Sequence, residues 1–391
     1  MTKPIGVAVI GAGMAGRSHA AGYRSATTQY GKGLPEVRLV AIADAVPAFA
    51  QETARRFGYE RAETSWQAIV DAPDIDVVSI VVANSLHREI AEALAAAGKH
   101  VLCEKPFAPT TADGEAMVKA AEEAGIHNAI GFTMRRSPAV AAIREAVLDG
   151  QIGRPNHVNM HYWCDYGASP SGPMSWRYRG GPGSGALADI GSHIIDLAEF
   201  LAGPISSVSG AVLTTAITER ALPAGTAVGH AAAELSDVTE KVDNEDVVTL
   251  TARFASGASG TFTASRITWG HPNALGFELS CENGAATFEL ERMGEFTLFD
   301  STDSRNSGYR RVLVGPDHPY LTGGLPMDFP GVNYGQNDLF TIQARAFLEQ
   351  VAGVENLPPC PDFAHGLHNL RILDAVVESA AKGGVEVTLD A

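Results

Sequence analysis

The chain has 391 residues, of which 45% are hydrophobic and 19% are charged. This composition is typical of a globular protein with a sizeable core. At roughly 150 residues per domain, the length predicts two domains, with three as the alternative. The 29 basic and 45 acidic residues give a net charge of −16. A nucleic-acid partner is therefore not expected, because an acidic protein repels phosphate backbones.

Nothing in the sequence indicates export, a membrane or a metal. The four cysteines lie far apart and form no CxxC pair, so we expect neither a zinc site nor a disulfide scaffold. The N-terminus lacks the basic region and the cleavage site of a signal peptide. No apolar run reaches the roughly 18–20 residues that span a bilayer. We therefore expect a cytoplasmic protein without membrane contact.

The first third of the chain alternates apolar runs with helix-like stretches rich in Ala, Glu, Lys and Arg. Apolar runs without polar alternation are typical of strands that are buried on both faces. Strands that alternate with helices predict an α/β fold, a doubly wound parallel sheet built from right-handed crossover units. The predicted strands are 5–10, 37–43, 76–83, 100–103 and 128–132, and the predicted helices are 15–26, 48–57, 87–97 and 112–124.

After about Arg136 the pattern changes, because the strand candidates alternate in polarity or come as hairpins. This pattern predicts an α+β domain with a large, mostly antiparallel open sheet and helices on one face. Asn283-Gly284 is a strong signal for a two-residue hairpin turn. The segments 221–243 and 300–336 are expected to be long loops. The predicted strands are 158–164, 247–254, 260–265, 276–281 and 285–290.

A glycine-rich turn follows the first predicted strand and precedes the first predicted helix. Gly11, Gly13 and Gly16 fit the pattern GxGxxG. Gly11 permits a tight turn, Gly13 lets a pyrophosphate approach the backbone, and Gly16 lets helix and strand pack closely. Free N–H groups at the helix N-terminus, near Met14 and Ala15, are then available to the phosphates. This arrangement predicts a dinucleotide site.

Asp44 ends the second predicted strand, where a carboxylate can accept hydrogen bonds from both ribose hydroxyls. Its interval from Gly16 exceeds the usual roughly 20 residues, which we attribute to a loop insertion around 27–35. The carboxylate would repel a 2′-phosphate, and Ala45-Val46-Pro47 offers no cation to bind one. NAD is therefore favoured over NADP. The alternative, a surface strand end, is less favoured because of the turn upstream.

A lysine and a polar stripe on a predicted helix are candidate catalytic groups. Lys105 follows the fourth predicted strand, at the edge where doubly wound sheets bind ligands, although most lysines are simply exposed. On a helix predicted over 186–202, Asp189, His193 and Asp196 form a polar stripe beside an apolar one. Such an aspartate can orient the imidazole as a base, although a solvated flank with an incidental ion pair is the alternative. Hydride transfer to nicotinamide needs a base for the hydroxyl proton and a group that stabilises the developing alkoxide. The ammonium group of Lys105 can be that second group.

Together these motifs resemble the Gfo/Idh/MocA oxidoreductases, the relatives of glucose–fructose oxidoreductase and inositol dehydrogenase, over essentially the whole chain. The resemblance is carried by Glu104-Lys105-Pro106, Ser175-Trp176-Arg177 and the run from Gly185 to Asp196. It implies an NAD-binding Rossmann domain over 1–133 and a substrate-binding and oligomerisation domain over 134–391.

Within the family, three segments are most similar to the sugar and inositol dehydrogenases of the levoglucosan dehydrogenase type. They are the insertion near 27–35, Ser265-Arg266 and the stretch 300–336. The resemblance implies a homodimer or homotetramer.

The family's functional residues are carried over position by position. The residues that match Lys105, Asp189 and His193 form the catalytic set, with the histidine as acid/base. The expected cofactor-binding residues are Gly11, Gly13, Met14, Ala15, Asp44, Ala83 (in place of a usual proline), Asn84, His87, Glu104, Lys105, Trp176 and Arg177. The expected substrate-binding residues are Lys105, Trp163, Asp165, Tyr166, Arg177, Asp189, His193 and Tyr334.

The implied reaction oxidises a secondary ring hydroxyl of a sugar, anhydrosugar or inositol to the ketone. His193 would take the hydroxyl proton while the hydride passes to NAD, and Asp189 would orient His193 and contact a neighbouring hydroxyl. The alternatives are an NAD-dependent glycoside hydrolase that acts through transient oxidation, an NADP-linked sugar reductase, and a non-catalytic sugar sensor. The presence of all three catalytic residues argues against the sensor.

Overall fold

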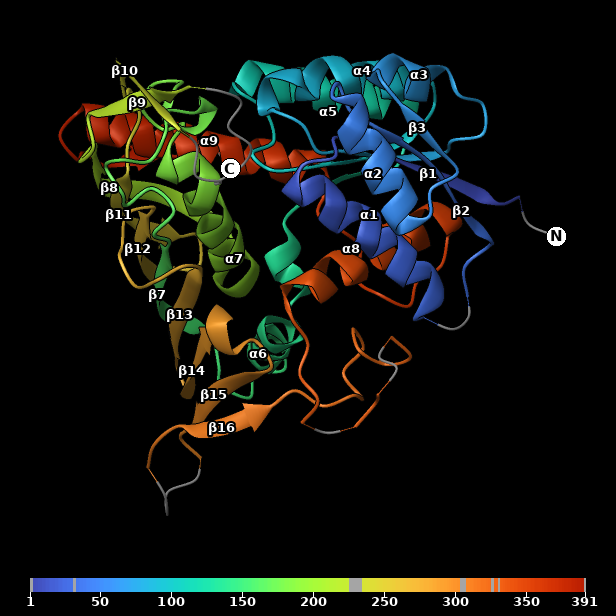
Figure 1. Ribbon diagram of the computed structural model, residues 1–391. Coiled ribbons are helices and arrows are strands. Elements are labelled where there is room, and N and C mark those ends of the chain that lie inside the picture. The colour runs from blue at the N-terminus through green and yellow to red at the C-terminus, as the bar shows by residue number, and fades with distance from the viewer. Residues whose placement is uncertain are drawn as a thin grey trace. The chain divides into compact units, whose positions relative to one another are not determined.

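The computed structural model describes residues 3–30, 33–224, 234–302, 307–324, 327–329 and 331–389. The chain forms two compact units (Figure 1). The first comprises residues 1–138 and 315–370, and the second comprises residues 139–314 and 371–391. Among the described helices, none is long and apolar enough to span a membrane.

The first unit is built on a six-stranded parallel sheet. β1 is apolar and buried along its whole length, as a strand covered on both faces must be. The order β3-β2-β1-β4-β5-β6 reverses direction between β1 and β4, which is where doubly wound sheets bind ligands. The predicted parallel sheet is therefore confirmed. Its strands are β1 (Ile5–Ile10), β2 (Val37–Ala43), β3 (Arg61–Glu63), β4 (Val77–Ile80), β5 (His100–Cys103) and β6 (Asn128–Ile130).

Two helical layers cover this sheet (Figure 1). One layer contains α1 (Met14–Thr28), α2 (Pro47–Phe57) and α8 (Gln336–Ala352), and the other contains α3 (Trp66–Asp71), α4 (His87–Ala96) and α5 (Thr111–Ala124). Helix α8 packs closely on α1 at Gly22, where a Cβ would lie 2.8 Å from the carbonyl oxygen of Phe340.

The segment 315–370 thus belongs to the first unit, whereas the sequence placed every residue after 133 in the second domain. The predicted boundary lies near the first change of unit, between Pro138 and Ala139. The reason for the difference is that α8 comes late in the chain but buries its apolar side against α1. The functions assigned to the two domains remain predictions.

Some elements of the first unit differ from the expected bounds. β4 ends at Ile80, well before residue 83, and a 3₁₀ turn over Asn84–Leu86 follows. β3 and α3 were not predicted, because three and six residues give too little periodicity. Helix α1 reaches Thr28, so part of the long interval before Asp44 is helix. Residues 31–32 of the expected insertion lie outside the described residues.

The second unit is built on a nine-stranded open sheet in the order β16-β15-β14-β13-β7-β12-β11-β8-β17. β7 and β12 pair in parallel and the other neighbours are antiparallel. The predicted mostly antiparallel open sheet is therefore confirmed. Its strands are β7 (Pro155–Trp163), β8 (Ile205–Thr214), β11 (Val247–Phe254), β12 (Ser259–Ser265), β13 (Ala274–Cys281), β14 (Gly284–Glu289), β15 (Glu295–Asp300), β16 (Arg310–Leu313) and β17 (Val387–Thr388).

Helix α7 (Ser192–Ala202) packs against β7 and is buried on several sides. Alternate residues of β11 are buried and exposed, so one face of the sheet is covered and the other is open. Helix α6 (Pro138–Leu148) begins at the last residue of the first unit, and α9 (Phe363–Ala381) is divided between the units after Leu370.

Three expectations for the second half of the chain are corrected. The expected loop 221–243 contains β10 (Leu235–Lys241), which pairs with β9 (Glu219–Pro223), and residues 225–233 lie outside the described residues. The expected loop 300–336 contains β16, and residues 303–306, 325–326 and 330 lie outside the described residues. β10 and β16 each contain several polar or charged residues, so their sequences lack a clear strand pattern. The predicted hairpin is present, but Gly284 already pairs with Asp300, so its turn precedes this glycine.

Candidate active site

The glycine-rich turn between β1 and α1 leaves open space in front of Gly13. Gly11 has a φ of 104°, and a Cβ on it would lie 2.0 Å from the carbonyl oxygen of Val81. A Cβ on Gly16 would lie 2.0 Å from the carbonyl oxygen of Gly11, whereas a Cβ on Gly13 would meet nothing within 4 Å. No side chain caps the first turn of α1, which begins at Met14 and contains no acidic residue. This turn therefore fits a bound pyrophosphate.

Asp44 lines a cavity of about 470 Å³ together with Gly13 and Ala83. Its Oδ2 accepts a hydrogen bond from Ala12 N at 2.7 Å, and its Oδ1 accepts one from Val46 N at 2.8 Å. The carboxylate therefore holds the glycine turn in place, a role that the sequence did not indicate. Each carboxylate oxygen has a further acceptor site, so ribose hydroxyls can still donate to it.

The same cavity has an aromatic and apolar wall that sequence reasoning missed. Trp66, at the start of α3, lines it with Leu86 and Ile90. A flat ring beside aliphatic side chains suits a planar base such as adenine. The available signal was the position of Trp66 shortly after a strand, but β3 itself was too short to predict.

The loop after β4 holds two predicted cofactor residues, Ala83 and Asn84. Ala83 has a φ of −59°, which is the value that proline imposes, so the loop keeps the proline-compatible shape without that residue. Asn84 begins the following turn and does not line the described cavity. The predicted contacts of these residues with the nicotinamide ribose remain predictions.

The side chain of His87 is buried between two loops. Its Nδ1 lies 3.1 Å from the carbonyl oxygen of Phe107, and its Nε2 lies 3.1 Å from that of Val82. These loops follow β5 and β4. A neutral imidazole has one N–H, so His87 donates to one of these two carbonyl oxygens and lies against the other. Burial lowers the pKa of His87 below its usual value, which favours the neutral ring.

Lys105 follows β5 and is half-buried. Its backbone N–H donates to Oε2 of Glu104 at 3.0 Å, and Oε1 of the same carboxylate lies 2.9 Å from Nε2 of His19. Both carboxylate oxygens of Glu104 therefore have protein partners. The sequence placed Glu104 among the cofactor-binding residues, and that contact remains a prediction.

Asp189 and His193 lie in the second unit, at the start of the predicted helix over 186–202. That helix opens with a π-helical turn over Leu187–Gly191 and continues as α7. The wider turn was not expected, because sequence periodicity does not distinguish it from an α-helix. Such turns often occur at functional sites in helices, and this one contains Asp189.

A buried carboxylate caps the N-terminus of this helical segment. Oε1 of Glu245 accepts hydrogen bonds from Gly185 N at 3.1 Å and Leu187 N at 2.9 Å, and Oε2 accepts one from Gly183 N at 2.7 Å. Burial raises the pKa of Glu245, although these N–H groups oppose the rise. The cap fixes where the π-helical turn begins, and with it the start of the segment that carries Asp189.

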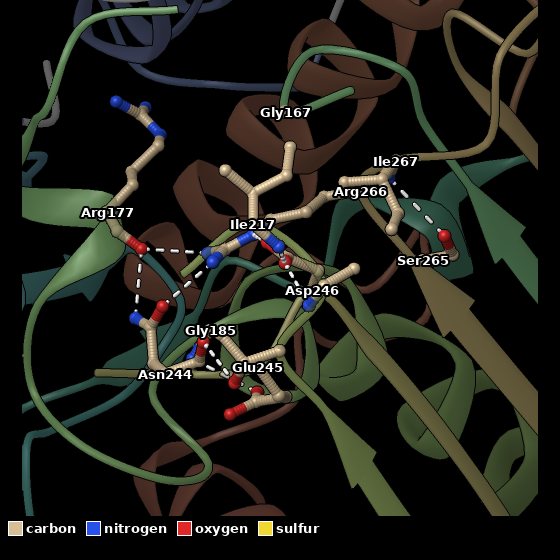
Figure 2. Close-up of polar contacts among 12 residues, drawn as sticks. Gly167, Arg177, Gly185, Ile217, Asn244, Glu245, Asp246, Ser265, Arg266 and Ile267 are labelled. Atoms are coloured by element: carbon tan, nitrogen blue, oxygen red, sulfur yellow. Dashed lines mark hydrogen bonds and ion pairs between the residues drawn. The ribbon is translucent and has the colours of Figure 1, made fainter. Parts of the chain in front are cut away.

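The residues that flank Glu245 bind a buried arginine (Figure 2). Arg266 donates from Nε to Asp246 Oδ1 at 2.8 Å, from Nη2 to Asn244 Oδ1 at 2.8 Å, and from Nη1 to the carbonyl oxygen of Arg177 at 2.9 Å. The side chains of Arg266 and Asp246 are 1% and 0% exposed. Asn244 also donates to the carbonyl oxygen of Arg177. The network therefore anchors the Trp176–Arg177 turn.

Sequence reasoning did not find this network, and it named Arg266 only through resemblance. The available signal was the run Asn244-Glu245-Asp246 directly before the strand predicted over 247–254. Three polar residues at such a place need partners, but the sequence does not show that those partners lie near 180 and 266.

Tyr166 contacts a predicted catalytic residue directly. Its hydroxyl donates to Asp189 Oδ2 at 2.6 Å, and the ring of Tyr162 lies 6.0 Å from that of His193. Burial raises the pKa of Tyr166, so its hydroxyl stays protonated and donates at neutral pH. Tyr166 is thus placed to orient Asp189, and its predicted contact with substrate remains a prediction.

The other predicted substrate residues are spread over both units. Trp163 stacks on His161 with ring centroids 4.0 Å apart. The guanidinium of Arg177 lies 4.4 Å above the ring of Trp176, which is 56% exposed. Asp165 is half-buried at the start of a turn that follows β7, and Tyr334 lies in the segment that belongs to the first unit, where its ring is buried.

Comparison with known proteins matches both halves of the chain. Residues 5–132 match the model described as an oxidoreductase family with an NAD-binding Rossmann fold, and residues 140–287 match the GFO/IDH/MocA C-terminal domain. The fold and the nucleotide site thus define an NAD-dependent oxidoreductase. The chain belongs to the Gfo/Idh/MocA oxidoreductase family.

Individual relatives cover almost the whole chain. Levoglucosan dehydrogenase of Pseudarthrobacter phenanthrenivorans is 40% identical over 97% of this chain and 96% of its own length. Inositol 2-dehydrogenase of Rhizobium meliloti is 29% identical over 96% of both chains. A solved structure of levoglucosan dehydrogenase with NADH and levoglucosan has a TM-score of 0.88 and 37% identity, and 99% of each chain is covered.

The buried pair of Arg266 and Asp246 generates a stability prediction. Arg266→Met leaves the Asp246 carboxylate buried without its cation, and such a change costs about 3–5 kcal/mol. Urea unfolding measures this loss. The control is Arg179→Met, which breaks an exposed pair with Glu240 and should cost less than about 1 kcal/mol. Equal effects of the two substitutions would contradict the interpretation.

The lowered pKa of His87 predicts acid sensitivity. The unfolded chain binds a proton at His87 near its ordinary pKa of about 6.5, whereas the folded chain resists it. The unfolding free energy should therefore fall as the pH drops below about 6.5, by up to about 1.4 kcal/mol per pH unit. His87→Gln should flatten this slope between pH 6.5 and 5. His157→Gln, at a histidine on β7, serves as the control, and a slope unchanged by His87→Gln would refute the prediction.

Proposed function

We propose that this protein is an NAD-dependent dehydrogenase that oxidises a secondary ring hydroxyl of a sugar, anhydrosugar or inositol to the ketone. The proposal rests mainly on one observation, which is that Gly13 and Asp44 line the same cavity. In this cavity, the space in front of Gly13 is open. The buried helical segment with Asp189 and His193 supports it, as do relatives whose names include levoglucosan and inositol dehydrogenase.

In the proposed mechanism, bound NAD supplies the acceptor for the hydride of the substrate carbon. His193 accepts the hydroxyl proton at a ring nitrogen, since an imidazole has the right basicity near neutral pH. The ammonium group of Lys105 donates a hydrogen bond to the reacting oxygen and stabilises the negative charge that develops on it.

Asp189 has a separate part in this mechanism. Tyr166 donates to one of its oxygens, Oδ2, and a carboxylate oxygen accepts more than one hydrogen bond. Asp189 can therefore orient His193 and accept a hydrogen bond from a neighbouring substrate hydroxyl. Arg177 and Trp163 supply a guanidinium and a stacking ring on which a polyol can be aligned.

We also expect a homodimer or homotetramer, which size-exclusion chromatography with light scattering will decide.

The first experiment follows NADH formation across inositols, monosaccharides and anhydrosugars, with NAD and NADP tested separately. We expect NADH to form with one class of cyclic polyol. Lys105→Ala and His193→Ala should each lower kcat by about 10²- to 10⁴-fold, while the Kd for NADH stays within a few fold. Lys119→Ala, at an exposed lysine on α5, is the control. Glycoside cleavage without net NADH would favour the hydrolase instead.

We expect Asp44 to determine the preference for NAD over NADP. Asp44→Ala removes the acceptor for two ribose hydroxyls and the charge that repels a 2′-phosphate. Hydrogen bonds to a charged group contribute about 1.5–3 kcal/mol, so the Kd for NADH should rise about ten- to a hundredfold. The Kd for NADPH should change less. Fluorescence titration of both cofactors checks this, and an unaltered ratio would mean that the ribose is bound elsewhere.

A further inference from the structure

A buried chain of hydrogen bonds ends at the backbone of Lys105. His19 on α1 lies with Nδ1 3.1 Å from Ser79 Oγ and with Nε2 2.9 Å from Glu104 Oε1. The hydroxyl of Tyr23 lies 2.9 Å from Ser79 Oγ. The other oxygen of Glu104, Oε2, accepts the N–H of Lys105 at 3.0 Å. These hydrogen bonds thus link α1, β4 and the end of β5 within the first unit.

These groups form one consistent donor sequence. An ionised carboxylate only accepts, so His19 donates from Nε2 to Glu104. In the neutral ring, Nδ1 then accepts from the hydroxyl of Ser79. Ser79 in turn accepts from Tyr23. Tyr23 and Ser79 are 0% exposed, His19 is 3% exposed and Glu104 is 8% exposed. A buried network in which each member has a partner is rigid, because a broken bond leaves a polar group without water.

The surroundings of the pair leave it little freedom. A Cβ on Gly131, directly after β6, would lie 2.6 Å from Glu104 Oε1, so only glycine leaves room for the carboxylate. The ring of Phe340 on α8 meets the ring of His19 edge-on, with centroids 5.3 Å apart. Packing on both sides therefore fixes the orientation of the imidazole and of the carboxylate.

We propose that His19 and Glu104 are a positioning pair for Lys105, which fix its backbone so that the ammonium group meets the reacting oxygen. This inference rests on the proposed function of Lys105. Neither His19 nor Glu104 has to touch substrate, since both act through the N–H of Lys105. The pair also explains why Glu104 directly precedes the lysine: its carboxylate turns back to the N–H of the next residue.

The principal test compares Glu104→Ala with Glu104→Gln, with kcat and the Kd for NADH measured separately. Glu104→Ala should lower kcat at least tenfold while the Kd for NADH changes less than threefold. Glu104→Gln keeps an acceptor oxygen for Lys105 N and a partner for His19, so kcat should return to within threefold of the unaltered protein. An unchanged kcat in Glu104→Ala, or an equal loss in both variants, would overturn the proposal.

Two further variants separate positioning from general stability. Lys99→Met removes a buried amine that donates to the carbonyl oxygens of Ala72 and Ile75 in the same unit. It should lower the thermal midpoint and leave kcat unaltered, and a fall in kcat equal to that of Glu104→Ala would count against positioning. If Glu104→Ala does not fold, Glu104→Asp replaces it, because the shorter side chain keeps the charge but cannot reach both partners. The same tenfold loss is expected.

A measurement without substrate keeps this proposal distinct from the proposed function. Lysines are labelled by ¹³C reductive methylation, and Lys105→Arg identifies the Lys105 signal by NMR. NADH should shift that signal in the unaltered protein and shift it less than half as far in Glu104→Ala. An equal shift in both would overturn the positioning pair. Absence of NADH formation with every polyol would overturn the proposed reaction, while the NMR comparison would still decide the pair.

Discussion

Carboxylates that accept backbone N–H groups hold three of the segments in which predicted site residues lie. A loop that leaves a strand has N–H groups without a ladder partner, and a carboxylate satisfies them with strong, charge-assisted bonds. Asp44 holds the glycine turn, Glu104 holds Lys105, and Glu245 holds the start of the segment with Asp189. The same residue type therefore supplies both the ligand contacts that we propose and the rigidity that those contacts need.

Neighbouring residues of one sequence motif have two different roles in the proposed mechanism, contact with ligands and support of the backbone. Glu104 and Lys105 are adjacent in a single motif, yet the carboxylate faces a buried histidine while the lysine is half-buried at the end of the strand. The ring of His87 lies between two carbonyl oxygens, and its predicted contact with the ribose remains a prediction. Adjacent residues of one motif can therefore have different roles, one in contact with ligands and the other in the shape of the backbone.

The sequence predicted the parts of the fold that depend on local pattern. β1, the glycine turn and β2, which ends directly before Asp44, were predicted because apolar runs and glycine spacing are visible in a few residues. The partners of His19 were not predictable, because Ser79 and Glu104 are brought to it only by the order of the parallel strands. The π-helical turn also escaped prediction, since its side-chain pattern differs little from that of an α-helix.

The return of residues 315–370 to the first unit has a consequence for synthesis of the chain. The face of α1 that contains Gly22 is completed by α8, so the nucleotide-binding unit cannot finish folding when residue 138 leaves the ribosome. Its folding is completed only after α8 has been synthesised. All strands of the nine-stranded sheet except β17 are synthesised before α8. An excised fragment of residues 1–138 would therefore expose an apolar helix face, and it is a poor choice for producing the cofactor-binding part alone.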